Sequence, residues 1–295
     1  MPITSLKTLM HFLQKKSTLI IAISVTIGVV MLLLQPKVLP EQKRMSIKIC
    51  NSASVDSIVL IDSTIVVPVL YQRIPDLKDM HYKKRMVKFI HMMLPSVLMA
   101  REKMILERQK VLEVGALMTQ GISSEEDSLY LEKLKGMYKT DNIDEVVKRL
   151  HPHPVSIILA QAAIESGWGT SRFCREANNI YGIWSYNSKE KRIKAGESRS
   201  GTNIYLRKYD SIFDSIYDYL LTISKANAYK QFREARLYSD NPYQLIWYLS
   251  NYSEKRYEYV RALRNVIEFN DLHLYDNYVL AEFDRSDPTW KELLD

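Results

Sequence analysis

One acidic residue stands at the end of an apolar run that is long enough for a short buried helix. Residues 157–164 are apolar apart from Gln161, and Glu165 follows directly, ahead of Ser-Gly-Trp-Gly. Desolvation and the partial negative charge of a helix C-terminus both raise the pKa of a carboxyl in that position. A carboxyl that keeps its proton near neutral pH can protonate a glycosidic oxygen.

Two arginines downstream support a different interpretation of the same carboxylate. An ion pair between Glu165 and Arg172 or Arg175 would keep the carboxyl ionised, and the residue pattern leaves both alternatives open. Gly167 and Gly169 allow the chain to turn sharply after the helix. That turn would leave the carboxyl at the edge of a cleft rather than inside the packing.

The elements that must position this carboxyl are mainly helical. We expect a helix over residues 154–166, then a charged segment over 187–201 and a strand over 203–209. Helical periodicity resumes at Asp214 and continues to Phe269. The pattern predicts a helical domain with one small β excursion in its middle.

The preceding region is also predicted to be helical. Periodic apolar residues indicate a helix over 82–114, which Pro95 is expected to break or kink. The residues Ser-Ser-Glu-Glu at 123–126 look like a cap that opens a helix through Leu134, and Asn142 opens another helix that runs to Leu150.

Charge and cysteine content narrow the function classes. The formal net charge of +7 and the pI of about 9.1 suit nucleic acid, an anionic membrane surface or an anionic polymer such as cell wall. No nucleic-acid-binding signature is present, so no nucleic-acid partner is predicted. Cys50 and Cys174 alone cannot build a disulfide framework or a zinc cluster, and His151 and His153 suit the start of a helix. No metal or cofactor is expected.

The N-terminal region contains a candidate membrane anchor. Residues 18–34 carry no charge and have a length near the lower limit for a bilayer span. The segment after this run lacks a small-residue cleavage site, which argues against a removable signal peptide. We expect a single-pass protein of the bacterial inner membrane with its main domain on the periplasmic or extracellular side. The predicted organisation is a cytoplasmic N-terminus (1–16), an anchor (17–35), a linker (36–67), a helical region (68–150), the main domain (151–272) and a tail (273–295).

A resemblance to a known family emerges from the longest motif. The residues AQAAIESGWGTSRF at 160–173 and NNIYGI at 178–183 resemble the glucosaminidase domain of bacterial Bax-like and FlgJ-related cell-wall hydrolases. The resemblance continues through 208–211, 228–233 and 252–260, and it covers about residues 68–272. It implies a mainly α, lysozyme-like α+β fold and cleavage of β-1,4 bonds between the amino sugars of peptidoglycan.

The resemblance also assigns roles to individual residues. Glu165 matches the family's catalytic acid, and Tyr252 matches a tyrosine that contacts the sugar near the scissile bond. A second carboxylate would be Glu190 or Glu197 on the β excursion, but neither lies in an alignable motif. An inverting, a retaining or a substrate-assisted mechanism therefore all stay open. The candidates for substrate binding are Trp168, Asn178, Asn179, Tyr181, Trp184 and Tyr209.

These observations predict a membrane-anchored peptidoglycan hydrolase of the endo-beta-N-acetylglucosaminidase type. Its partners would be peptidoglycan glycan strands and, through the N-terminal helix, the membrane. A lytic transglycosylase also needs an acid but no carboxylate to activate water. A non-catalytic wall-binding or scaffold protein would use the same cleft without needing Glu165.

Overall fold

The computed structural model describes residues 44–196 and 203–294. The predicted cytoplasmic N-terminus, the predicted anchor at 17–35 and the candidate Glu197 all lie outside the described residues. Within the described ranges, no helix has the length and apolar character needed to cross a membrane. Met45–Asp295 form one compact unit, which is mainly helical with three small two-stranded sheets among its described residues.

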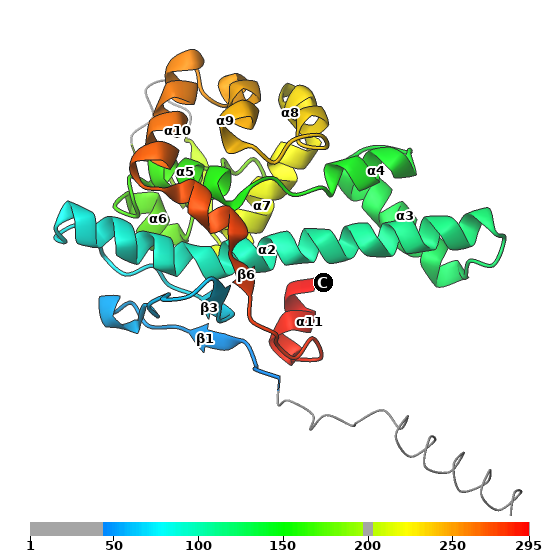
Figure 1. The fold of residues 1–295 in the computed structure, drawn as a ribbon, viewed down its shortest axis with the longest axis horizontal. Helices are drawn as coiled ribbons and strands as arrows, with labels where there is room; N and C mark the ends of the chain where they lie inside the picture. The colour runs from blue at the N-terminus through cyan, green and yellow to red at the C-terminus, as the bar shows by residue number, and fades with distance from the viewer. Residues whose placement is uncertain (1–43, 197–202, 295) are drawn as a thin grey trace, which may run out of the picture. The chain divides into compact units, whose positions relative to one another are not determined.

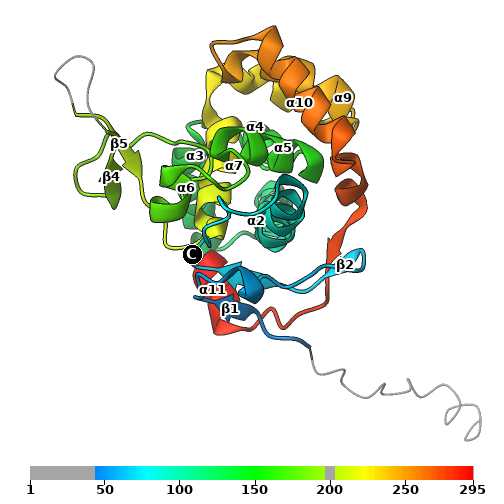
Figure 2. The ribbon, with the colours of Figure 1, turned by 90° about the vertical axis from the view of Figure 1, so that its left-hand side faces the viewer.

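The long helix α2 (Tyr82–Thr119) runs through this unit. Helices α5 (Val155–Ser166) and α7 (Ile212–Lys225) pack against α2 on one side, and β1, β3 and α11 lie on the other (Figures 1 and 2). The apolar run that ends at Glu165 thus forms α5, and almost all of its residues are buried. The helix predicted there is confirmed.

Pro95 was expected to break or kink this helix. The break is wrong, because α2 continues through Pro95, and the kink stays a prediction. Proline removes one helical hydrogen bond and crowds the preceding turn, which costs roughly 3 kcal/mol or more. Every residue from Met92 to Ala100 is buried in the core. Burial of a large apolar side chain contributes about 1.5–3 kcal/mol, so the packing of this stretch offsets the cost of the proline.

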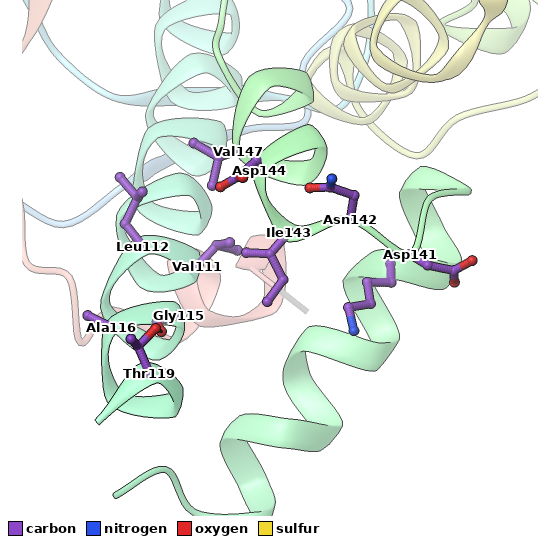
Figure 3. A pocket seen from close by; sticks show the side chains of 11 residues that line it. Val111, Leu112, Gly115, Ala116, Thr119, Asp141, Asn142, Ile143, Asp144 and Val147 are labelled. Atoms are coloured by element: carbon purple, nitrogen blue, oxygen red, sulfur yellow. The ribbon is translucent and has the colours of Figure 1, made fainter. Parts of the chain in front are cut away.

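Helices α3 (Glu125–Tyr138) and α4 (Ile143–Arg149) pack against the C-terminal half of α2. Ser124 caps α3 in a reciprocal capping box with Asp127, and the side chain of Asn142 caps α4, so both predicted N-caps are confirmed. A cavity of about 490 Å³ lies beside this small core, between α2 and α4, and contains none of the predicted site residues (Figure 3). It is lined by Val111, Leu112, Gly115, Ala116, Thr119, Lys135, Asp141, Asn142, Ile143, Asp144 and Val147.

The predicted β excursion follows the short helix α6 (Arg172–Ala177). Strands β4 (Arg192–Lys194) and β5 (Tyr205–Arg207) pair antiparallel, with Ile193 opposite Leu206. This hairpin projects from the side of the helical body (Figure 2).

The C-terminal part of the domain consists of short helices that lead to α10 (Tyr257–Phe269). Helix α10 packs on α5, so residues as far apart in the sequence as Glu165 and Tyr259, 94 positions, come into contact. Between α7 and α10 lie the 3₁₀ helices η2 (Asn227–Tyr229) and η3 (Ile246–Tyr252) and the α-helices α8 (Lys230–Ala235) and α9 (Pro242–Leu245).

Segments that composition assigned to a linker and a tail contribute strands and a helix to the same unit. Strand β1 (Lys48–Cys50) pairs in parallel with β3 (Val69–Tyr71), and β2 (Ile65–Val66) pairs in parallel with β6 (Val279–Leu280). Their apolar residues, including Val66, Phe283 and Trp290, are buried in the main core, which explains why these segments are ordered. The remaining elements are η1 (Val55–Ser57), η4 (Leu272–Asn277) and α11 (Pro288–Leu294).

Candidate active site

Glu165 is the penultimate residue of α5, and the chain turns sharply after it. Gly167 ends the helix with φ +58°, in the left-handed region that favours glycine. The backbone N–H of Trp168 donates to the carbonyl of Ala163 at 2.9 Å, which closes the last turn. Gly169 also has a positive φ, of +80°. The sharp turn predicted from the two glycines is confirmed.

The carboxyl of Glu165 is half-buried and has a neutral hydrogen-bond partner. The Tyr259 hydroxyl of α10 donates to its Oε1 at 2.9 Å. Burial raises the pKa of Glu165 above its usual value, and the hydrogen bond from Tyr259 offsets only part of that rise. The carboxyl therefore favours its protonated form more than an exposed glutamate does.

The two arginines that could have held Glu165 ionised have other partners. Arg175 Nη1 pairs with Asp76 Oδ2 at 2.7 Å, and Arg172 Nη1 lies 3.3 Å from Glu176 Oε2. Across residues 44–196 and 203–294, no ion pair involves Glu165. The interpretation that Glu165 forms an ion pair with Arg172 or Arg175 is therefore wrong.

Tyrosines surround this carboxyl. The Tyr252 ring stacks on Tyr259, with centroids 5.3 Å apart and planes at 11°, and it also approaches Tyr229 at 6.0 Å. Burial raises the pKa of Tyr252, Tyr229 and Tyr259, and the nearby charge of Glu165 raises each of them further. The structure therefore brings the predicted pair, Glu165 and Tyr252, into one cluster.

Sequence reasoning missed the roles of Tyr259 and Tyr229 in this cluster. Both residues lie inside the motif segments, seven positions after Tyr252 and next to Lys230 respectively. Tyr259 occupies the buried face of an amphipathic helix, where an aromatic residue is typical of core packing. Only the packing of α10 on α5 reveals that its hydroxyl reaches Glu165.

With this geometry established, comparison with known proteins identifies the domain. Residues 140–272 match the sequence model of the glucosaminidase family, described as mannosyl-glycoprotein endo-beta-N-acetylglucosaminidase. These residues form a glucosaminidase domain. The match includes Glu165, Tyr252 and Tyr259, and the resemblance predicted from the motif is confirmed.

Two curated proteins are similar to the chain over part of their length. Protein bax of Escherichia coli (strain K12) is 28% identical over 107 residues, which are 36% of this chain and 37% of that protein. Exo-glucosaminidase LytG of Bacillus subtilis (strain 168) is 26% identical over 162 residues, which are 52% of this chain and 54% of that protein. The chain thus spans about a third and about half of the lengths of these relatives.

Solved structures also show similarity to the chain. The catalytic domain of the autolysin Auto from Listeria monocytogenes is 24% identical with a TM-score of 0.36, over 50% of this chain and 86% of that one. The glycoside hydrolase domain of Salmonella typhimurium FlgJ is 23% identical with a TM-score of 0.35, over 46% of this chain and 87% of that one.

Within the glucosaminidase domain, the two predicted asparagines bind backbone atoms of the protein itself. Asn178 Nδ2 donates to the carbonyls of Gln72 and Tyr209, each at 3.0 Å. Asn179 Nδ2 donates to the carbonyls of Ile183 and Arg207 at 2.9 and 2.8 Å. These bonds tie the end of α6 to the β excursion and to Gln72, so both amides hold backbone segments of the protein together.

Two of the predicted aromatic residues also have internal partners. Tyr181 is buried, stacks on Tyr219 with centroids 4.0 Å apart, and donates to the Ile158 carbonyl at 3.3 Å. The Tyr209 hydroxyl donates to Asp218 Oδ2 at 2.6 Å. Tyr181 therefore belongs to the packing beneath the tyrosine cluster, and Tyr209 belongs to a polar cluster between β5 and α7.

The two tryptophans differ in exposure. Trp168 packs edge-on against Phe89 of α2, with ring centroids 5.7 Å apart, and is only partly exposed. Trp184 is 50% exposed and lies beside the more exposed Tyr186, with centroids 6.3 Å apart. Of the six predicted binding residues, Trp184 offers the most open aromatic surface to a sugar.

Glu190, the described candidate for the second carboxylate, lies in an ion pair. Its Oε2 is 3.3 Å from Nε of Arg207, and Arg207 also pairs with Asp218 at 2.7 Å. A hydrogen bond from Ser185 and the charge of Arg207 hold the pKa of Glu190 below its usual value. Glu190 is thus held ionised on the β excursion, and none of its hydrogen bonds or ion pairs reaches Glu165.

In the part of the chain that the structure describes, no group of three or more His, Cys, Asp or Glu side chains is arranged to hold a metal ion.

Proposed function

We propose that this protein is a peptidoglycan hydrolase whose glucosaminidase domain cleaves the β-1,4 bond at N-acetylglucosamine, with Glu165 as general acid. The observation that carries the proposal is the half-buried Glu165 carboxyl, whose pKa is raised by burial and whose hydrogen-bond partner is the neutral hydroxyl of Tyr259. The match to the glucosaminidase family and the similarity to an exo-glucosaminidase support the same reaction class.

In the proposed reaction, Glu165 gives its proton to the glycosidic oxygen as the bond from that oxygen to C1 breaks. Water then supplies hydroxide to C1, and its remaining proton passes to a base. Glu190 and Glu197 are the candidates for this base, and the N-acetyl oxygen of the substrate is the alternative nucleophile. Tyr252 contacts the sugar next to Glu165 in this proposal, and its stacking on Tyr259, the hydrogen-bond partner of Glu165, supports that role.

Product analysis of purified peptidoglycan tests this proposal. The full chain in detergent is incubated with peptidoglycan, and the new ends are reduced with borohydride and identified by mass spectrometry. We expect N-acetylglucosamine at the new reducing ends. Anhydro-sugar ends would instead assign a lytic transglycosylase, and the absence of new ends would assign a non-catalytic wall-binding protein.

We further propose that residues 17–35 anchor the chain in the bacterial inner membrane, with the domain on the periplasmic or extracellular side. The uncharged apolar run and the location of the proposed substrate support this topology. Both native cysteines are buried, so a cysteine introduced at the exposed Leu129 is a specific probe. We expect a membrane-impermeant maleimide to label Leu129→Cys in cells whose outer layers have been opened by osmotic shock and whose inner membrane is intact. Labelling only after lysis would contradict the topology.

A further inference from the structure

A chain of hydrogen bonds runs through the interior of the domain and ends at Glu165. Arg236 Nη1 lies 3.4 Å from His153 Nδ1, and His153 Nε2 lies 3.0 Å from the Tyr219 hydroxyl. That hydroxyl contacts Gln161 Oε1. Gln161 Nε2 lies 3.1 Å from the Tyr259 hydroxyl, which reaches Glu165 Oε1 at 2.9 Å. Five links thus connect a buried guanidinium to the proposed acid.

The chemistry of the first residue fixes the direction of every link. A guanidinium only donates, so His153 Nδ1 accepts and the ring carries its proton on Nε2. His153 therefore donates to Tyr219, whose single proton then goes to Gln161 Oε1. The amide nitrogen of Gln161 donates to the Tyr259 oxygen, which leaves the Tyr259 proton for Glu165.

Burial disfavours any other order. The side chains of Arg236, His153, Gln161 and Tyr219 are at most 1% exposed, so water cannot replace a lost partner. Arg236 is anchored at the far end, where its Nη2 donates to the Arg149 carbonyl at 2.9 Å. Desolvation and the charge of Arg236 hold the pKa of His153 well below its usual value, in agreement with a neutral ring. A reversed link would leave a buried donor or acceptor unpaired.

We propose that Arg236, His153, Tyr219, Gln161 and Tyr259 form a positioning relay that always presents a donor to Oε1 of Glu165. The acid proton of Glu165 then resides on Oε2, the oxygen that is left for the substrate. The catalytic consequence rests on the proposed function, whereas the placement of the proton does not.

The other titratable groups around Glu165 do not disturb this arrangement. They are the hydroxyls of Tyr252 on η3, Tyr229 on η2 and Tyr181 after α6, and burial raises the pKa of each one. All three therefore stay neutral over the range in which a glutamate titrates.

The relay is tested by titrating Glu165 itself, because that measurement needs no catalysis. The ¹³C-carboxyl signal of Glu165, assigned with Glu165→Gln, is followed against pH in the full chain. Tyr259→Phe removes the final donor and should raise the pKa of Glu165 by about one unit. Tyr219 is separated from Glu165 by two members of the relay, Gln161 and Tyr259. Tyr219→Phe frees Gln161 to turn its amide, and should therefore raise the pKa of Glu165 by a smaller amount.

Tyr217→Phe is the matched control. The Tyr217 hydroxyl donates to Oε1 of the half-buried Glu107 at 2.9 Å, so this change also removes a part-buried Tyr–Glu bond but lies outside the relay. It should leave the pKa of Glu165 unchanged. If Tyr219→Phe does not fold, Gln161→Met breaks the middle of the relay instead.

These experiments test the relay and the proposed function by different measurements, so one proposal can be contradicted without the other. A pKa of Glu165 that rises in the relay variants but not in Tyr217→Phe supports the relay even if peptidoglycan is not cleaved. An unchanged pKa in folded Tyr259→Phe and in folded Tyr219→Phe or Gln161→Met overturns it, even in an active hydrolase. In an active enzyme, the alkaline limb of the pH–rate profile should shift upward together with the measured pKa.

Discussion

At the residue scale, the proposed reaction depends on Glu165. The amide of Glu165→Gln has nearly the size of the carboxyl and can still accept from Tyr259, so the fold should persist. Because the amide cannot give up a proton, peptidoglycan hydrolysis should fall by at least ~10²–10⁴-fold, the usual contribution of a general acid. The rate of release of reducing ends measures this loss. Activity within a few-fold of the wild-type rate would mean that Glu165 is not the acid.

The same residue predicts a dependence of stability on pH. Burial raises the pKa of Glu165 in the folded state above its unfolded value, so its stabilising contribution is complete below the unfolded pKa. This contribution is lost as the pH rises through the folded-state pKa. The amide of Glu165→Gln does not titrate in this range. The Tm of the variant minus the Tm of the wild type should therefore increase as the pH rises from 4 to 8. Melting curves at several pH values check this, and a constant difference in Tm would contradict it.

At the element scale, the turn after α5 sets the position of Glu165. Gly169 has φ +80°, and an added Cβ would lie 3.1 Å from a ring carbon of Phe89 and 3.3 Å from a methyl of Leu77. Gly169→Ala should therefore lower the free energy of unfolding by more than the ~1–3 kcal/mol of backbone strain alone. Urea denaturation measures this loss.

Gly182 provides a control for the backbone term. It has φ +67°, and no heavy atom lies within 4 Å of the position that a Cβ would take. Gly182→Ala should show strain without crowding, and should cost less than Gly169→Ala. Equal losses of unfolding free energy in the two variants would mean that crowding against Phe89 and Leu77 does not destabilise Gly169→Ala.

At the scale of the whole molecule, the C-terminal segment closes the core beneath α2. Trp290 of α11 is fully buried against Phe283, and Lys103 Nζ of α2 donates to the Leu293 carbonyl at 2.6 Å. Trp290→Ala should lower the free energy of unfolding by about 3–5 kcal/mol, the usual cost of truncating a buried aromatic side chain. Phe269→Ala is the control, because that ring is 81% exposed and its loss should cost about 0.5 kcal/mol or less. Similar losses in both variants would contradict a structural role for the segment.

The sequence by itself determined the features that depend on neighbouring residues. The apolar run and Gly167 specify a helix that ends just beyond Glu165, and Ser124 and Asn142 cap their helices as expected. Burial of that helix also determined the direction of the pKa shift of Glu165. Capping and helix termination act within a few residues, so they can be inferred from a local pattern.

Only the tertiary structure decided which groups meet at the site. Tyr259 reaches Glu165 from 94 positions away, and Arg175 takes Asp76 from 99 positions away as its partner. The inward orientation of Asn178 and the continuity of α2 through Pro95 likewise depend on packing. These outcomes result from long-range contacts, whose energies exceed the local preferences of the residues involved. A linear pattern does not encode which distant segment supplies the contact, so the relay behind Glu165 is a property of the fold.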